Sequence, residues 1–117
     1  GQTYKKLFLN LLSIFDSCSD SFLNYLKKNR RNLAYDIGRI ASDYQLSTEL
    51  GICALSFYEG RHVLPDSIPL PWVYYHIAKL EKMKGDISRM EIFISKVKPF
   101  KNDYPSISSL INRLIQQ

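Results

Sequence analysis

Apolar residues recur at steps of three and four along most of the chain, and this spacing restricts the fold more than any other feature. A step of three to four matches the 3.6-residue turn of an α-helix, so the apolar side chains line up on one helix face. No segment shows the strict alternation that predicts a strand. The β-prone residues Ile92, Phe93 and Ile94 lie inside a helical period. The pattern therefore predicts an all-α protein.

Capping residues, glycines and prolines divide this pattern into about seven helices. Asn32 and Asp86 are expected N-caps, Ser47 is expected to begin the fourth helix, and Gly60 lies where a C-cap needs a positive φ. The segment 61–71 contains prolines at positions 65, 69 and 71, so it is the expected linker. The helices are expected in segments 3–16, 20–26, 33–44, 47–59, 72–84, 87–98 and 105–114.

The length of 117 residues, with 45% hydrophobic and 13% aromatic residues, is typical of one globular domain, 1–117. The chain begins with glycine rather than methionine, which suggests either the scar of a removed tag or an excised segment of a longer protein. The apolar-leaning run 7–15 is far shorter than the roughly 20 residues that span a bilayer. Together with Lys5 and Lys6 it imitates a signal peptide, but Asp16 stands where such a peptide needs a small residue, so a helix is favoured.

The residues that usually carry chemistry are few and scattered. Cys18 and Cys53 are isolated, and the histidines are His62 and His76, so neither a metal site nor a cofactor is expected. Two free thiols in a reducing compartment are favoured over a disulfide, which gives a preference for the cytoplasm. Phosphate loops and nucleophile motifs are not found, and His76 is interpreted as structural. We therefore expect no catalytic residue.

A shift of the chain by 40 residues aligns it with itself. The shift pairs Tyr35 with Tyr75, and it also pairs the small residues Gly38 and Ala78. A period of 20 to 50 residues with two helices in each unit is the mark of an α-solenoid, in which stacked hairpins share a continuous core.

The segment 71–98 resembles a tetratricopeptide repeat. Tyr74, Ile77 and Ala78 stand where that motif has its large, aliphatic and small residues of helix A, and Gly85 with Asp86 matches its turn.

The segment 31–65 resembles the motif less well, with Gly38 in the small position and Gln45 in place of the turn glycine. Met90 and Glu81 depart from the family pattern within the better unit. HEAT-like or other helical packing is the alternative.

The resemblance implies a protein partner bound on the concave face that helix A lines, without chemistry. A tyrosine and a cation recur one turn apart on both units, as Tyr35 with Arg39 and Tyr75 with Lys79. Such a pair suits an acidic or aromatic peptide. The alternative is that each tyrosine packs on its own cation. Carried over by position, the concave face receives Trp72, Tyr75, Lys79, Lys82 and Met83, and Asn32, Tyr35, Arg39, Ser42 and Asp43. The predicted partner-binding residues are Tyr35, Arg39, Trp72, Tyr75, Lys79 and Lys82.

The net charge of +5 and the pI near 9.3 raise the question of an anionic partner. Cations at helix ends are commonly solvated, and acidic residues interleave with them, so nucleic acid is the less favoured partner. A non-enzymatic adaptor domain is the first hypothesis. A helical accessory domain of a larger bacterial enzyme and a basic RNA-binding module are the alternatives. The cations gather in two groups, Lys27, Lys28, Arg30 and Arg31, and Lys79, Lys82, Lys84, Arg89, Lys96, Lys98 and Lys101.

Overall fold

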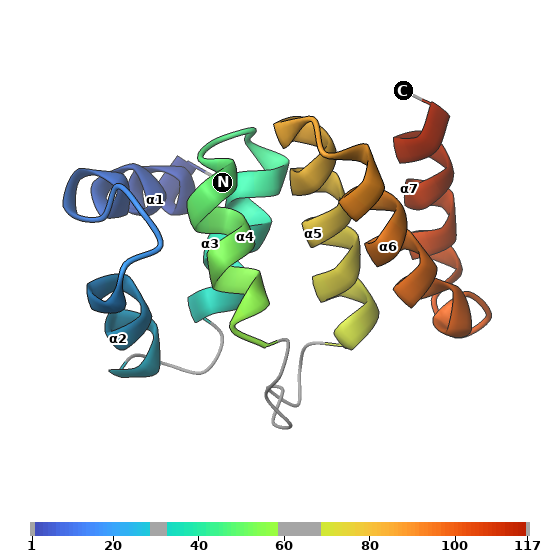
Figure 1. Cartoon of the computed structure of the whole chain (residues 1–117), viewed down its shortest axis with the longest axis horizontal. Helices are drawn as coiled ribbons and strands as arrows, with labels where there is room; N and C mark the ends of the chain where they lie inside the picture. Colours follow the sequence, from blue (N-terminus) through green and yellow to red (C-terminus); the bar gives the residue numbers. More distant parts are fainter. Residues whose placement is uncertain (1, 29–32, 59–68, 117) are drawn as a thin grey trace.

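The chain forms seven α-helices in the computed structural model, which describes residues 2–28, 33–58 and 69–116 (Figure 1). A short 3-10 helix, η1 (Lys98–Phe100), precedes the last of them, and the described residues contain no strand. The prediction of an all-α fold with about seven helices is confirmed. The helices are α1 (Gln2–Ile14), α2 (Asp20–Lys28), α3 (Leu33–Asp43), α4 (Thr48–Ser56), α5 (Leu70–Lys84), α6 (Ile87–Val97) and α7 (Pro105–Gln116).

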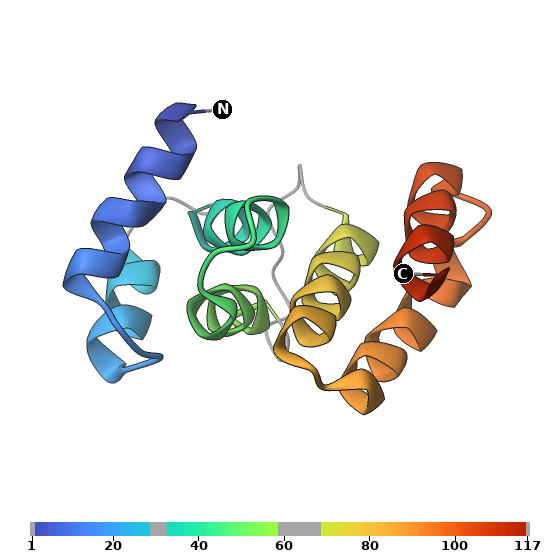
Figure 2. The ribbon, with the colours of Figure 1, turned by 90° about the horizontal axis from the view of Figure 1, so that it is seen from above.

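The helices from α3 onward stand side by side in chain order. Helix α3 packs against α4, α4 against α5, and α5 against α6, while α5 also contacts α3 and α7. The view from above shows this row, with the two hairpins α3–α4 and α5–α6 next to each other (Figure 2). Helix α1 contacts α3 and lies across the end of the row (Figure 1). Helix α5 therefore meets both helices of the preceding hairpin.

The turns inside the two hairpins share one hydrogen-bond pattern. At the α5–α6 turn, Gly85 has a φ of 95° and the N–H of Asp86 donates to the carbonyl of Glu81 at 2.9 Å. Forty positions earlier Gln45 has a φ of 53°, and the N–H of Leu46 donates to the carbonyl of Ala41 at 3.0 Å. Both are helix C-caps that place one residue in the left-handed region.

The helices that follow these turns begin in the same way. The side chain of Ser47 accepts a hydrogen bond from the N–H of Leu50, and that of Asp86 accepts one from the N–H of Arg89. Asp86 is the N-cap expected from the sequence, and Ser47 stands where the sequence predicted the start of a helix. Asn32, Gly60, positions 29–31 of the basic run and positions 61–68 of the expected linker lie outside the described residues.

Close packing within the first hairpin depends on one glycine. A Cβ at Gly38 would come within 2.1 Å of Cγ of Leu55, a fully buried side chain of α4. Only glycine lets the two helix backbones approach so closely. The position that corresponds to Gly38 on α5, forty residues later, holds another small residue, Ala78, which is fully buried.

One apolar core runs along the row and consists of the helix faces that the spacing indicated. Helix α1 contributes Phe8 and Leu11, and α7 contributes Ile107 and Leu114. Each helix thus buries its apolar stripe against its neighbours, which is where most of the stability of short helices originates. The most deeply buried large side chains include Phe8, Phe22, Ile40, Leu50, Leu55, Ile77, Leu80, Phe93 and Ile107.

The expectation of two free thiols is wrong. Cys18, in the connection between α1 and α2, forms a disulfide with Cys53 of α4, and their Cα atoms lie 5.9 Å apart. The backbone N–H of Cys18 also donates to the carboxylate of Glu49 on α4. The sequence showed two cysteines without paired spacing, and only the packing of the N-terminal segment on α4 brings them within bonding distance.

A buried carboxylate lies beside the α5–α6 turn. Glu81 of α5 is 1% exposed, and its Oε2 accepts a charge-assisted hydrogen bond from Nε of Arg89 on α6. Nζ of Lys84 lies 3.9 Å from the other carboxylate oxygen. Glu81, which departs from the repeat pattern, is thus half of an ion pair that joins α5 to α6.

None of the described helices is long and apolar enough to cross a membrane.

Candidate functional site

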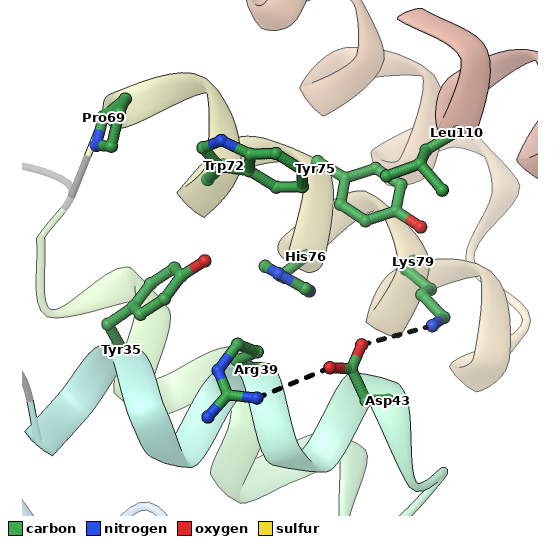
Figure 3. A pocket seen from close by; sticks show the side chains of 9 residues that line it. All are labelled: Tyr35, Arg39, Asp43, Pro69, Trp72, Tyr75, His76, Lys79 and Leu110. Carbon is green, nitrogen blue, oxygen red and sulfur yellow. Dashed lines mark ion pairs between the residues drawn. The ribbon is translucent and has the colours of Figure 1, made fainter. Parts of the chain in front are cut away.

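A hollow of about 570 Å³ lies between α3 and α5 (Figure 3). Pro69, at the N-cap of α5, borders one side, and Leu110 of α7 borders the other. This volume is within the range of pockets that hold small ligands or single side chains. The residues that line it are Tyr35, Arg39, Asp43, Pro69, Trp72, Tyr75, His76, Lys79 and Leu110.

Helical spacing places these side chains on two facing surfaces. On α3, Tyr35, Arg39 and Asp43 follow one another at intervals of four residues, which puts them on one face. On α5, Trp72, His76 and Lys79 do the same at intervals of four and three, with Tyr75 beside them. Because α5 packs on α3, the two surfaces converge (Figure 3).

The structure brings together five of the six partner-binding residues expected from the sequence. Tyr35 and Arg39 come from α3, and Trp72, Tyr75 and Lys79 come from α5. Tyr75 is only 6% exposed, so its ring belongs to the wall of the hollow rather than to an open surface.

Lys82 is the predicted residue that lies elsewhere. Its ammonium group donates a hydrogen bond to the backbone carbonyl of Leu114. It therefore connects α5 to the end of α7 and does not line the hollow. Lys82 follows Lys79 by three positions and so starts from nearly the same face of α5. The contact with α7 is what draws its ammonium group away from the hollow.

The wall of the hollow that α5 forms is largely aromatic. The ring centroids of Trp72 and Tyr75 lie 6.1 Å apart, edge to face. The indole of Trp72 is stacked on the imidazole of His76 at 6.2 Å, and the ring of Tyr35 meets the same imidazole edge-on at 5.7 Å. Rings in mutual contact form a rigid surface that binds apolar groups with little loss of entropy.

The opposite side of the hollow is charged, with two cations and one carboxylate among the lining residues. The carboxylate of Asp43 lies 3.7 Å from the guanidinium of Arg39 and 3.6 Å from the ammonium group of Lys79 (Figure 3). These separations exceed the 2.7–2.9 Å of a tight charge-assisted hydrogen bond. The sequence indicated both cations but not that Asp43 would bridge them across two helices.

His76 forms the floor of the hollow. Its Nδ1 lies 2.7 Å from Oγ of Ser42 on α3, and both side chains are buried. Burial lowers the pKa of His76 to about 4, with the positive charges of Lys79 and Arg39 acting in the same direction and Asp43 opposing them. The imidazole is therefore neutral at physiological pH.

The tyrosines of the hollow keep their protons. Burial raises the pKa of Tyr35 to about 12, and it also raises the pKa of Tyr75. Tyr35 is held in place because its backbone N–H donates to the hydroxyl of Tyr58 at 2.9 Å. Both rings thus offer neutral hydroxyl groups to a ligand.

Three lining residues have roles that sequence reasoning did not assign to the site. Pro69 was interpreted as part of a linker, His76 as structural, and Leu110 as an apolar position of the last helix. The signal in the sequence was the position of His76 one turn from both Trp72 and Lys79, on a face already assigned to the groove.

The pairing of Ser42 with His76 does not form a nucleophile with its base. Ser42 has no exposed surface, so its hydroxyl lies behind the imidazole and out of reach of a substrate. Within the described ranges there is also no group of three or more acidic, histidine or cysteine side chains that could hold a metal ion. The chemistry that the hollow offers is hydrogen bonding, charge and aromatic contact.

A second hollow, of about 720 Å³, lies beside the disulfide on the other side of the hairpin. It is more apolar, with Leu23 of α2 and Ile52 and Phe57 of the α4 region among its lining residues, next to Cys18 and Cys53. The sequence gave no indication of it, because its two sides meet only through the fold.

Comparison with family models, curated proteins and solved structures yields no match. The function therefore has to be argued from the geometry of the site.

Proposed function

We propose that this chain is a non-enzymatic protein-interaction domain that binds a peptide segment of a protein partner in the α3–α5 hollow. The observation that carries the proposal is the convergence of Tyr35 and Arg39 with Trp72 and Lys79, from helices related by a shift of 40 residues. Aromatic and arginine side chains are typical of the residues that dominate binding energy at protein interfaces.

We also propose that the two hairpins are tetratricopeptide-like repeats of a short α-solenoid. The shared turn pattern at Gln45 and Gly85 supports this, as does the small residue at Gly38 and Ala78. The hollow then lies between the first helices of successive repeats, where the resemblance places the partner. In an accessory domain of a larger enzyme, the same hollow would hold a segment of that enzyme.

The ion pairs of α5 and α6 favour a peptide over nucleic acid. Lys79 lies beside Asp43, and Lys84 and Arg89 lie beside Glu81. The ammonium group of Lys96 lies over the ring of Phe93, at 4.7 Å from its centroid. Much of the basic cluster on these two helices is thus engaged within the protein, whereas phosphate binding needs cations presented to the ligand.

The disulfide bears on where this binding takes place. The preference for the cytoplasm rested on free thiols, and Cys18 and Cys53 are bonded. Disulfides persist in oxidising environments such as the bacterial periplasm or the cell exterior. We therefore propose an oxidising compartment instead of the cytoplasm.

The test is selection of binding peptides from a random display library, with the single tryptophan, Trp72, as reporter. Selected peptides should change Trp72 fluorescence and lose affinity for an Arg39→Ala/Lys79→Ala variant. A Lys28→Ala variant, changed at the exposed end of α2, should bind them as the wild type does. Peptides that bind the double variant equally well, or that leave Trp72 unaffected, would show that the hollow is not the binding site.

A further inference from the structure

We propose that the α3–α5 hollow selects an Asp or Glu side chain of the bound peptide, holds its carboxylate with Arg39, Lys79 and Nε2 of His76, and takes up a proton at His76 on binding. This inference rests on the proposed function, because it specifies what the hollow recognises in a peptide. It goes beyond that function in naming the recognised group and the coupling to pH.

Two cations of the hollow lie close enough together to hold one ligand carboxylate. Arg39 and Lys79 both approach the carboxylate of Asp43, at 3.7 and 3.6 Å, which is longer than a tight charge-assisted hydrogen bond. The side chain of Asp43 is 41% exposed, so these contacts are partly screened by water. A ligand carboxylate between the same two cations can form charge-assisted hydrogen bonds with both of them.

His76 is oriented for this role by its contact with Ser42. The contact occupies Nδ1 on the buried side of the ring, so a ligand in the hollow meets the other nitrogen, Nε2. The neutral ring has two tautomers, because either the Ser42 hydroxyl donates to Nδ1, or Nδ1–H donates to Oγ of Ser42 while the hydroxyl points to Oδ1 of Asp43. In the first tautomer and in the protonated ring, Nε2–H is a hydrogen-bond donor toward the hollow, which suits a carboxylate oxygen.

The same contact can also hold the protonated ring. Nδ1–H then donates to Oγ of Ser42, and the hydroxyl proton of Ser42 turns toward Oδ1 of Asp43, 3.5 Å away. Nδ1 of His76 and Oγ of Ser42 keep each other as partners in both protonation states, because a hydroxyl can accept and donate. The buried side of the ring thus permits proton uptake without an unsatisfied group.

The ligand supplies the charge that makes proton uptake favourable. The charged groups that act on His76 are Asp43 and Arg39 from α3 and Lys79 from α5. The titratable rings of Tyr35 and Tyr75 also contact the imidazole, at 5.7 and 5.1 Å, and α7 borders the hollow with the apolar Leu110. Without ligand, burial and the two cations lower the pKa of His76. A second carboxylate beside Nε2 opposes both cations and raises that pKa. Linkage then requires that lower pH strengthens binding.

The aromatic wall selects what stands next to the carboxylate. Trp72, Pro69 and Leu110 line the parts of the hollow away from the charges. A peptide with an acidic residue flanked by aliphatic side chains therefore matches both sides. If the test peptide contains no tryptophan, the fluorescence signal comes from Trp72 alone.

The experiment compares two tripeptides, acetyl-Leu-Glu-Leu-amide and acetyl-Leu-Gln-Leu-amide, in titrations of the oxidised chain followed by Trp72 fluorescence. Near pH 6 the Glu peptide should bind about tenfold more tightly, the effect of charge-assisted hydrogen bonds. Its affinity should rise several-fold from about pH 7.5 to about pH 5.5, whereas that of the Gln peptide should stay constant, since free Glu titrates near 4.3. Calorimetry in buffers of different ionisation enthalpy should detect proton uptake with the Glu peptide only.

The outcomes separate this inference from the proposed function. Equal binding of the two peptides, or binding of the Glu peptide without proton uptake, would overturn the inference and leave peptide binding intact. Displacement of both peptides by inorganic phosphate would indicate a general anion site and would also overturn it. If neither peptide affects Trp72, the proposed function fails as well.

A His76→Gln variant isolates the proton. Its side-chain amide can still donate to a carboxylate but cannot take up a proton, so the preference for Glu should persist while the pH dependence disappears. Persistence of the pH dependence in this variant would overturn the assignment to His76. If the variant does not fold, proton uptake by the wild-type chain decides the question.

Discussion

Oγ of Ser42 on α3 lies 2.7 Å from Nδ1 of His76 on α5, and this buried contact joins the two helices that form the hollow. The packing of α5 on α3 thus positions a neutral imidazole under an aromatic and charged cavity. The contact also affects the stability of the fold. Burial lowers the pKa of His76, so the free energy of unfolding depends on pH.

Stability should fall between neutral and mildly acidic pH. His76 has a pKa of about 4 in the folded chain and 6.5 when unfolded, so below 6.5 the unfolded chain binds a proton that the folded chain does not. The contribution of the neutral His76 to the free energy of unfolding is complete above pH 6.5 and decreases as the pH falls toward 4. Urea unfolding should show a loss of about 2 kcal/mol from pH 7 to pH 5. A His76→Gln variant should lack this loss, and the same slope in both chains would contradict the assignment.

Reduction of the Cys18–Cys53 disulfide should destabilise the chain. The bond closes a loop across 35 positions and ties the N-terminal helices to α4, so its removal should lower the free energy of unfolding by about 3 to 4 kcal/mol. Unfolding of the oxidised chain should be sensitive to a thiol reductant, and a Cys18→Ser/Cys53→Ser variant should not respond. Titration of two thiols in the native, unreduced chain would disprove the bond.

Gly38→Ala should destabilise the chain although alanine favours helices. The new Cβ would lie 2.1 Å from Cγ of Leu55, so α3 and α4 must separate, at a cost of about 1 to 3 kcal/mol. The change can be measured by thermal or urea unfolding. In combination with Leu55→Ala, which removes the obstructing atoms, the added cost of Gly38→Ala should largely vanish. Additive effects of the two changes would show that the helices are not in this contact.

Arg89→Ala should be more damaging than its exposed position suggests. It leaves the carboxylate of Glu81, which is 1% exposed, without its main partner, at a cost of about 2 to 4 kcal/mol. A Glu81→Gln change in the same background should recover part of the loss, because it removes the buried charge. Unfolding experiments on the single and double variants test this, and a further loss in the double variant would refute it.

Much of the fold could be predicted from the sequence, because helix formation here depends on local features. The step of three and four residues indicated each helix face, and Ser47 and Asp86 marked helix starts through their own hydrogen bonds. The resemblance to a tetratricopeptide repeat also placed six of the nine lining residues, Asp43 among them, on one face. Helical spacing is consistent with this, since it puts residues such as Trp72 and Lys79 on the same side of α5.

Contacts between segments that are far apart in the sequence could not be predicted, because they depend on how the helices pack. Lys82 continues the same helix, yet the proximity of α7 draws it to the carbonyl of Leu114. Cys18 and Cys53 lack any local signal of pairing, and the packing of the N-terminal segment on α4 joins them.

The same distinction applies to the centre of the site. Residue spacing alone indicated seven helices with apolar faces and placed aromatic and basic residues on two of them, because side-chain direction within a helix follows from that spacing. Only the packing of α5 on α3 buried His76 against Ser42 and set Asp43 between two cations. Burial and charge proximity are properties of surfaces that meet, so they could not be read from either helix alone.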